Sequence, residues 1–431
     1  MLRNMKQTLI EWKMREERLP MLLLGARQVG KTYLLKEFGR EYYKDVVYIN
    51  FEQEPGMRSL FDRDLKPERI ISEIEMTLMR KIDPEHTLII WDEIQLEMRA
   101  VTVLKYFAES STQYHIVGAG SLLGVALNRE TFSFPVGKVT MHYLYPLTFD
   151  EFLRGIGQEM ALPLIASAYA ANEPLSDIVH EQLLERYTQY LYTGGMPAAI
   201  NEFVRCKLSV IDFDRSVLEN ILNAYIADMS KYTTRSEVLK VQAIYRSIPN
   251  QLAGDSRKFK YSLVEKDARG TTYGSSIEWL LLSQVSIECP MINRPEIPLA
   301  GYREDKHFKL YLSDVGLLMN MARIPYLTRA RENELNLFKG PVTENYVAQQ
   351  LKAKGYQLYY WKNNTHEVDF IIQKGDSIIP IEVKSSTNTR SRSLREFVRQ
   401  YGSAESIRLS KKNFGYVDGI RSIPLYAAYL I

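Results

Sequence analysis

The chain has 431 residues, of which 45% are hydrophobic and 25% charged, and its formal net charge is +3. This length exceeds what one hydrophobic core usually supports, so about three domains are expected. The composition argues against a disordered chain, and the net charge is too small to indicate a binding partner by itself.

No segment indicates a membrane span or an oxidising compartment. Apolar runs such as Met21 to Leu24 are far shorter than the roughly 18 residues of a membrane helix. The N-terminus lacks the apolar core of a secretory signal. Cys206 and Cys289 stand far apart and outside any CxxC pattern, which argues against a disulfide framework or a zinc site. We therefore expect a cytoplasmic protein without membrane contact.

Residues 1–155 alternate short apolar runs with helical segments, which predicts an α/β core with a mostly parallel sheet covered by helices. The expected strands are Met21–Leu24, Val46–Phe51, Leu88–Trp91 and His115–Val117.

The first expected strand runs into the sequence GARQVGKT, residues 25–32, and a helical run follows. In this context glycines permit a tight turn whose backbone N–H groups point at phosphate oxygens. Lys31 adds a positive charge near the β and γ phosphates, and Thr32 offers a hydroxyl to Mg²⁺. The sequence thus predicts a P-loop NTPase that binds ATP through Gly25, Gln28, Val29, Gly30, Lys31 and Thr32.

A second motif supports the first, because the strand at residues 88–91 ends in Asp92 and Glu93. In P-loop ATPases an acid at this place helps to hold Mg²⁺, and a neighbouring glutamate orients the attacking water. We expect Asp92 to be the Mg²⁺ ligand and Glu93 the catalytic base; two ordinary surface acids are the alternative. After the last strand, Ser121 is expected to contact the γ phosphate or water, with a capping serine as an equal alternative.

The rest of the chain divides into three predicted parts. Residues 156–230 carry apolar residues at helical spacing and lack strand patterns, which predicts a helical lid. In residues 231–330, helical stretches precede two strand-like segments around a polar loop, an order that predicts a winged helix. Residues 331–431 begin with a helix followed by strands, which predicts a small α/β domain.

With GARQVGKT, LIIWDEIQ and PLTFDEFL (residues 146–153) in this order, the chain resembles AAA-type prokaryotic ATPases that carry a C-terminal domain of unknown function. GGMP (residues 194–197) and LYLSDVGL (residues 310–317) match two further signatures of that family. The resemblance covers nearly the whole chain and implies an ATPase core, a helical lid, a winged helix and a tail similar to PD-(D/E)XK nucleases. Lys138 departs from the arginine expected there, which puts an arginine's role in hydrolysis in doubt, because lysine cannot form a bidentate fork.

The tail contains an expected hairpin that turns at residues 374–377. A symmetric loop around this turn places Asp369 opposite Glu382. Like charges opposed in this way destabilise a sheet unless a cation binds, so we expect a site for Mg²⁺ or Mn²⁺. Lys384 lies on the same face as Glu382 and is expected to activate water or to stabilise charge on a phosphodiester. With Glu344 on the preceding helix as a further ligand, these residues reproduce the acidic and E-x-K elements of PD-(D/E)XK nucleases, as the resemblance implies.

Other interpretations of the tail stay open. The same pairing brings Glu367 opposite Lys384 as a plain salt bridge, and Glu344 alone is most often a solvated helix charge. Pro380 has no N–H and can shift the register. A basic excess near the C-terminus suits a DNA backbone or a solvated face equally. The basic residues are Arg390, Arg392, Arg395, Arg399, Arg408, Lys411, Lys412 and Arg421.

The leading interpretation is a Mg²⁺-dependent ATP hydrolase whose nucleotide state repositions a winged helix and a nuclease-like tail on DNA. The alternative is an ATP-driven regulatory or interaction switch with a catalytically silent tail. Homo-oligomers are compatible with both.

Overall fold

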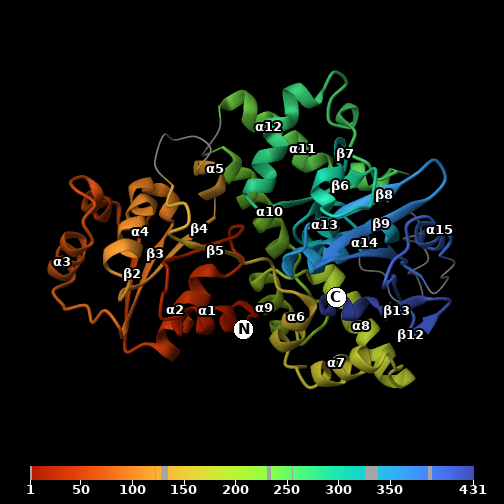
Figure 1. Ribbon diagram of the computed structural model, residues 1–431, viewed down its shortest axis with the longest axis horizontal. Helices are drawn as coiled ribbons and strands as arrows, with labels where there is room; N and C mark the ends of the chain where they lie inside the picture. The colour runs from red at the N-terminus through yellow and green to blue at the C-terminus, as the bar shows by residue number, and fades with distance from the viewer. Residues whose placement is uncertain are drawn as a thin grey trace. The chain divides into compact units, whose positions relative to one another are not determined.

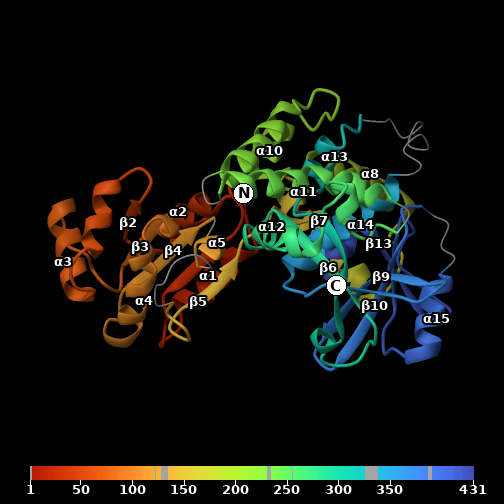
Figure 2. The same ribbon diagram turned by 90° about the horizontal axis from the view of Figure 1, so that it is seen from above.

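The computed structural model describes residues 2–121, 123–127, 134–230, 234–254, 256–325, 338–386 and 391–431, so Arg390 lies outside the described residues. The chain forms two compact units (Figures 1 and 2). The N-terminal unit contains residues 2–145 and 282–284, and the C-terminal unit contains residues 146–281 and 285–431. No helix in the described ranges is long and apolar enough to cross a membrane.

The N-terminal unit is built on a parallel sheet with strand order β2-β3-β4-β1-β5. Its central strands are buried along their whole length, as parallel strands covered on both faces must be. The predicted α/β core is confirmed, with one unexpected edge strand, β5. The strands are β1 (Met21–Leu24), β2 (Asp45–Asn50), β3 (Thr87–Asp92), β4 (His115–Gly120) and β5 (Thr140–Tyr143).

Helices cover this sheet, with α1 packed on α2 and α3 packed on α4. A line of aromatic rings in edge-to-face contact, from Phe51 through Phe61 and Trp91 to Phe107, joins β3 to α4 and to the loop after β2. The helices are α1 (Met5–Lys13), α2 (Lys31–Tyr42), α3 (Pro67–Leu78), α4 (Met98–Ser110) and α5 (Leu123–Leu127), with 3₁₀ turns η1 (Pro55–Phe61) and η2 (Ile94–Leu96).

The C-terminal unit combines a helical region with a mixed sheet of strand order β12-β13-β11-β10-β9-β8-β6-β7. Its strands are β6 (Ser286–Ile292), β7 (Arg303–Leu312), β8 (Tyr359–Lys362), β9 (Glu367–Lys374), β10 (Ser377–Val383), β11 (Ile407–Ser410), β12 (Gly415–Val417) and β13 (Ile420–Pro424). Its helices are α6 (Phe149–Gly155), α7 (Ala161–Ala171), α8 (Asp177–Thr193), α9 (Pro197–Arg205), α10 (Ser216–Met229), α11 (Arg235–Ala253), α12 (Gly270–Leu282), α13 (Val315–Met321), α14 (Lys339–Ala353) and α15 (Arg392–Tyr401).

The expected hairpin of the third predicted part is formed by β6 and β7, which pair antiparallel. The same β6 also pairs in parallel with β8, with Met291 opposite Tyr360. This hairpin and the strands of the tail therefore share one sheet. The four-part division of the chain stays a prediction.

The hairpin of the tail has the expected register. Ser377 pairs with Lys374 and Ile381 with Phe370, as the symmetric turn requires. Pro380 pairs with Ile371 without shifting the ladder, so the alternative of a slipped register is wrong.

Three sequence signatures meet inside the C-terminal unit. The N–H of Leu147 donates to the carbonyl of Gly195 at 2.7 Å, and the N–H of Gly195 donates to Asp314 Oδ2 at 2.6 Å. A Cβ on Gly194 would lie 2.1 Å from Asp314 Oδ1, so only glycine fits there. Burial raises the pKa of Asp314 to about 6, although three backbone N–H groups oppose this rise. These signatures therefore fix the packing of this unit.

Candidate functional site

The loop between β1 and α2 has the backbone that a phosphate-binding loop needs. Gly25 has φ +151°, and a Cβ there would lie 2.2 Å from the carbonyl oxygen of Leu144. Gly30 has φ +95° directly before α2. The ammonium of Lys31 is buried and donates to the carbonyls of Gly25 at 2.8 Å and Ala26 at 2.9 Å. The loop therefore curls around its own lysine.

The charge on Lys31 depends on the acids at the end of β3. Burial lowers the pKa of Lys31 to about 8, and the carboxylates of Glu93 and Asp92 oppose this shift. Both predicted acids thus lie close enough to the ammonium to act on it.

The two sequence motifs are joined by a hydrogen bond from Thr32 Oγ1 to Asp92 Oδ2, at 2.6 Å. Two further donors hold the same carboxylate, which is 3% exposed. Tyr48 donates to Oδ2 at 2.9 Å, and the N–H of Glu93 donates to Oδ1 at 3.0 Å. The Thr32 hydroxyl and the Asp92 carboxylate therefore lie side by side, and both carry the oxygen ligands that Mg²⁺ prefers.

Glu93 is held by a neighbour that sequence reasoning missed. Its backbone has φ +52°, and Gln95 Nε2 donates to Glu93 Oε2 at 2.5 Å. Within the described residues, Gln95 Oε1 and Ser121 Oγ are buried and have no hydrogen-bond partner. Buried polar atoms of this kind usually have a partner, so both atoms are available to hydrogen-bond a ligand. The only signal in the sequence was the position of Gln95 two residues after Glu93.

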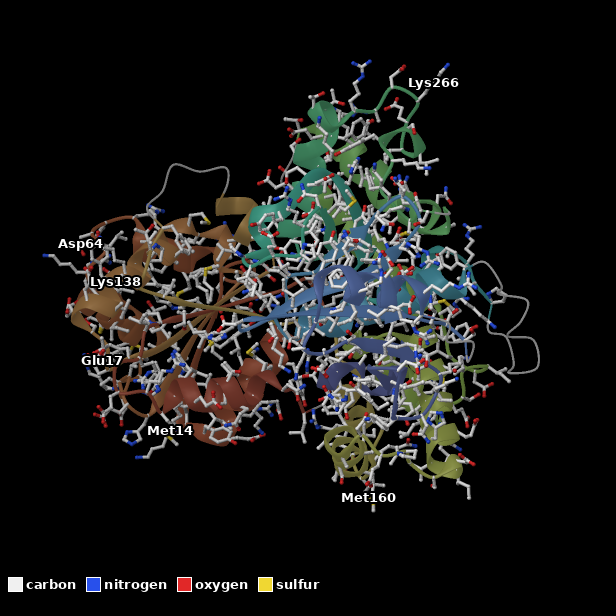
Figure 3. The ribbon with its side chains drawn as sticks, turned by 45° about the vertical axis from the view of Figure 1, so that its right-hand side comes forward. Met14, Glu17, Asp64, Lys138, Met160 and Lys266 are labelled. Atoms are coloured by element: carbon white, nitrogen blue, oxygen red, sulfur yellow. The ribbon has the colours of Figure 1, made fainter. Side chains whose placement is uncertain are left out.

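Lys138 lies at the surface of the N-terminal unit (Figure 3). Its ammonium is 3.5 Å from Glu109 Oε1. This ion pair is exposed and contributes little to the stability of the fold.

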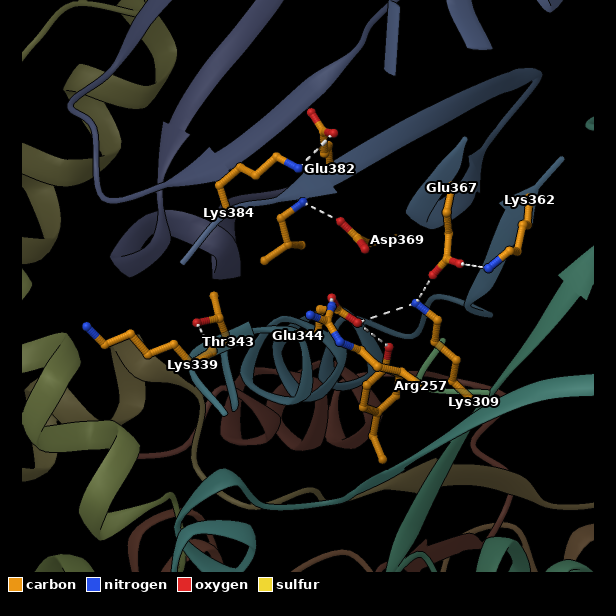
Figure 4. A network of polar contacts seen from close by, with 12 residues as sticks. Arg257, Lys309, Lys339, Thr343, Glu344, Lys362, Glu367, Asp369, Glu382 and Lys384 are labelled. Carbon is orange, nitrogen blue, oxygen red and sulfur yellow. Dashed lines mark hydrogen bonds and ion pairs between the residues drawn. The ribbon is translucent and has the colours of Figure 1, made fainter. Parts of the chain in front are cut away.

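In the C-terminal unit, Asp369 on β9 and Glu382 on β10 lie at the end of the hairpin ladder (Figure 4). Asp369 Oδ2 accepts the N–H of Val383 at 2.8 Å. Glu382 is 2% exposed, and its Oε1 lies 3.0 Å from Lys384 Nζ. Glu382 Oε2 is buried and has no hydrogen-bond partner among the described residues. This oxygen is therefore available to accept a hydrogen bond or to bind a cation.

The structure does not join Glu344 to this pair as a three-carboxylate group. Among the described residues, no group of three or more His, Cys, Asp or Glu side chains is placed to hold a metal ion. Nor is Glu344 a solvated helix charge, because it is 1% exposed. It forms ion pairs with Arg257 and with Lys309, the latter at 3.4 Å, and accepts from the hydroxyl of Tyr311 at 3.1 Å (Figure 4).

The alternative interpretation, a salt bridge between Glu367 and Lys384, is wrong. Glu367 Oε1 lies 2.7 Å from Lys309 Nζ, and its Oε2 lies 2.9 Å from Lys362 Nζ. Burial alone would raise the pKa of Glu367, but these two ammonium groups lower it. Lys309 is fully buried between two acids, which nothing in the local sequence indicated.

Several of the C-terminal basic residues are paired with acids. Arg395 lies 2.5 Å from Asp418, and Arg399 lies 2.6 Å from Glu396. Arg408 is only 4% exposed. The local excess of positive charge is therefore smaller at the surface than the sequence suggests.

Comparison with known families gives three matched regions. Residues 17–153 match the model of an AAA domain, residues 184–328 match a domain of unknown function, DUF8612, and residues 339–428 match another, DUF4143. Most of the N-terminal unit thus matches the model of an AAA domain, and its parallel sheet carries the GARQVGKT loop between β1 and α2. No curated protein matches the sequence.

Solved structures give only loose similarities. A Walker-type ATPase of Pyrococcus abyssi has 15% identity and a TM-score of 0.45, covering 74% of this chain and 94% of that one. The ORC2 protein of Aeropyrum pernix has 13% identity and a TM-score of 0.41, covering 75% and 93%. The RuvB Holliday junction branch migration motor of Thermotoga maritima has 15% identity and a TM-score of 0.29, covering 68% and 88%. TM-scores this low support no argument about function.

Proposed function

We propose that this protein is a Mg²⁺-dependent ATP hydrolase. The observation that carries the proposal is the 2.6 Å hydrogen bond between Thr32 and Asp92, which joins the end of the phosphate loop to the acid of β3. Lys31 and the N–H groups of residues 25–32 bind the phosphates. Thr32 and Asp92 hold Mg²⁺, which when bound neutralises charge on the β and γ phosphates.

Two side chains change partners when ATP is hydrolysed. Lys31 gives up the carbonyls of Gly25 and Ala26 and turns its ammonium to the phosphates. Glu93 gives up Gln95 and accepts a proton from the attacking water as general base. Ser121 Oγ supplies a polar contact to that water or to the γ phosphate.

Phosphate release from ATP by the purified chain tests this proposal, with Mg²⁺ or with excess EDTA. Release that requires Mg²⁺ supports it. A chain that neither binds ATP with Mg²⁺ nor releases phosphate from it contradicts it.

A second candidate function is metal-dependent cleavage of DNA by the C-terminal unit, coupled to the nucleotide state. Its support is the buried Oε2 of Glu382, without a partner among the described residues, together with Lys384 at 3.0 Å and Asp369 on the neighbouring strand. Asp369 and Glu382 fit a divalent cation, whereas Glu344 does not, because two cations of the protein already neutralise it.

DNA binding is proposed for the segment that includes α11, α12 and the hairpin of β6 and β7. Helices followed by a hairpin are the order of elements in a winged helix. The N–H of Phe259 also donates a hydrogen bond to the carbonyl of Phe308 in β7, at 2.8 Å. In the competing proposal, the chain is an ATP-driven switch whose tail does not cut DNA. Under both proposals the protein acts in the cytoplasm, as a monomer or a homo-oligomer.

DNA incubated with Mg²⁺ or Mn²⁺ separates these two proposals. The parent protein is compared with an Asp369→Ala Glu382→Ala double variant and with Asp376→Ala, which changes an acid in the turn of the same hairpin. Cleavage by the parent and by Asp376→Ala, lost in the double variant, supports the nuclease. If the parent leaves DNA uncut while it hydrolyses ATP, the silent tail is favoured.

A further inference from the structure

Next to the phosphate loop, Tyr48 contacts the acid of β3 from a neighbouring strand. Asn50 and Asp92 are direct partners in the ladder of β2 and β3, and Tyr48 lies on the same face of β2 as Asn50. The hydroxyl of Tyr48 lies 2.9 Å from Asp92 Oδ2, and Asn50 Nδ2 lies 3.1 Å from the Tyr48 oxygen. We propose that Tyr48 is a positioning residue that orients Asp92 and so sets the affinity of the site for the Mg²⁺ of bound ATP. This inference rests on the proposed ATPase function.

The direction of each hydrogen bond in this chain follows from its donors and acceptors. Asn50 Oδ1 accepts the backbone N–H groups of Glu52 at 2.9 Å and Gln53 at 3.0 Å, which assigns the other amide atom as the nitrogen. That nitrogen donates to the phenol oxygen of Tyr48. The phenol hydrogen is thereby directed at Asp92, and the chain stabilises the ionised carboxylate in one orientation.

The acceptor positions of Asp92 show why this orientation matters. Oδ2 accepts from Thr32 and from Tyr48, and Oδ1 accepts from the N–H of Glu93. Among contacts in the described part of the chain, this leaves one acceptor position, on Oδ1. Mg²⁺ retains bound waters in protein sites, and one of these waters suits that position. Without the Tyr48 hydrogen, the carboxylate has a second open acceptor position, on Oδ2, and only Thr32 and the N–H of Glu93 still fix its orientation.

The ring of Tyr48 is fixed from the side of the phosphate loop as well. Lys36, on α2, places its ammonium 3.4 Å from the centre of the ring. The contact with Asp92 is thus held by α2, by β2 and by the loop after β2.

Tyr48→Phe tests the proposal, because it removes the donor and keeps the ring. The measurement is the affinity for ATP by calorimetry over a series of free Mg²⁺ concentrations, and for ATP alone in EDTA. The free Mg²⁺ concentration that gives half of the full effect is expected to rise by about 10- to 100-fold, as for loss of one hydrogen bond to a charged acceptor. Affinity in EDTA is expected to stay unchanged.

Tyr43→Phe is the matched control, because it removes a phenol contact at 2.7 Å from His115 in the same unit. It is expected to keep the parental Mg²⁺ dependence. The proposal is overturned if Tyr48→Phe keeps the parental dependence, or if Tyr43→Phe shifts it equally. A parent chain that binds no ATP at any Mg²⁺ concentration overturns the ATPase proposal itself, a result distinct from either of these.

Discussion

Asp92 in the N-terminal unit and Glu344 in the C-terminal unit are carboxylates with almost no exposed surface, 3% and 1%. Asp92 is held by neutral donors, namely two hydroxyls and one backbone N–H. Glu344 is held by an ammonium and a guanidinium besides one phenol. Neutral donors orient a carboxylate without cancelling its charge, which stays available to a metal ion, whereas the cations around Glu344 already cancel its charge.

Glu382 lies between these extremes. One of its oxygens contacts Lys384, which is partly exposed, and the other is buried and has no partner among the described residues. A buried acid is therefore a metal candidate only when its own protein has not supplied the counter-charge. By this criterion Asp92 is the strongest candidate of the three, Glu382 the next and Glu344 the weakest.

The largest effect is expected where the N-terminal site depends on a single charge. Lys31→Ala removes the ammonium inside the phosphate loop, and the affinity for ATP is expected to fall by at least about 100-fold, as for loss of charge-assisted contacts to phosphate. Calorimetric titration with Mg²⁺ and ATP measures this. Lys44→Ala, an exposed lysine of the same unit, is the control. Equal ATP affinity in Lys31→Ala and the parent would sink the assignment of the loop.

Glu93→Gln sharpens the comparison by separating binding from turnover. Glutamine keeps the shape and a hydrogen bond but cannot accept a proton, so turnover is expected to fall by about 10²–10⁴-fold while ATP still binds. Single-turnover phosphate release and ATP titration on the same preparation measure the two effects. A variant with undiminished turnover removes Glu93 from the role of base.

Glu344→Gln tests the other side of the comparison through stability. It removes the acid that pairs with Arg257 and one of the two acids beside the fully buried Lys309, which keeps only Glu367. A loss of about 3–5 kcal/mol in the free energy of unfolding is expected, as for the breaking of a buried ion pair. Urea unfolding of the C-terminal unit, followed by tyrosine and tryptophan fluorescence, is the measurement. Glu382→Gln, whose lysine reaches solvent, is expected to lose about 1 kcal/mol or less. An unchanged midpoint in Glu344→Gln would mean that its charge is not used as described.

A smaller effect is expected from pH on ATP binding. The pKa of Lys31 is lowered to about 8 by burial, so the free protein loses this charge as the pH rises through 8. Affinity for ATP is expected to weaken above that pH, by up to about tenfold per unit. Glu93→Gln removes the carboxylate that most strongly opposes the lowering of the Lys31 pKa. The loss of ATP affinity should therefore begin at a lower pH in this variant. Titrations between about pH 7 and 9 that show constant affinity in both proteins contradict this account.

The smallest effect is expected on the basic helix α15. Arg399 is largely exposed and already paired with Glu396 on the same helix. Its loss in Arg399→Ala is expected to change the affinity for a DNA duplex by less than about threefold, because the acid beside it offsets the contact. Fluorescence anisotropy at two salt concentrations measures this. A loss of tenfold or more would show that α15 contacts the backbone directly.

Local sequence patterns were sufficient for much of the N-terminal site. A glycine-rich loop after an apolar strand, and two acids at the end of another, predicted the parallel sheet that the structure confirms, because strand, turn and helix preferences act over a few residues. The register of β9 and β10 was likewise predictable from the symmetry of one short turn. The catalytic roles assigned to Glu93 and Lys384 stay predictions.

The sequence by itself determined the glycine-rich loop, the two acids at the end of β3 and the hairpin that brings Asp369 and Glu382 to neighbouring strands. Only the tertiary structure decided which side chains contact the buried acids. Lys309 reaches Glu344 across 35 positions of the chain, and Tyr48 reaches Asp92 across 44. Such pairs depend on how strands and helices pack in space. No local periodicity records them, which is why a carboxylate ready for a metal ion and one already neutralised look alike in the sequence.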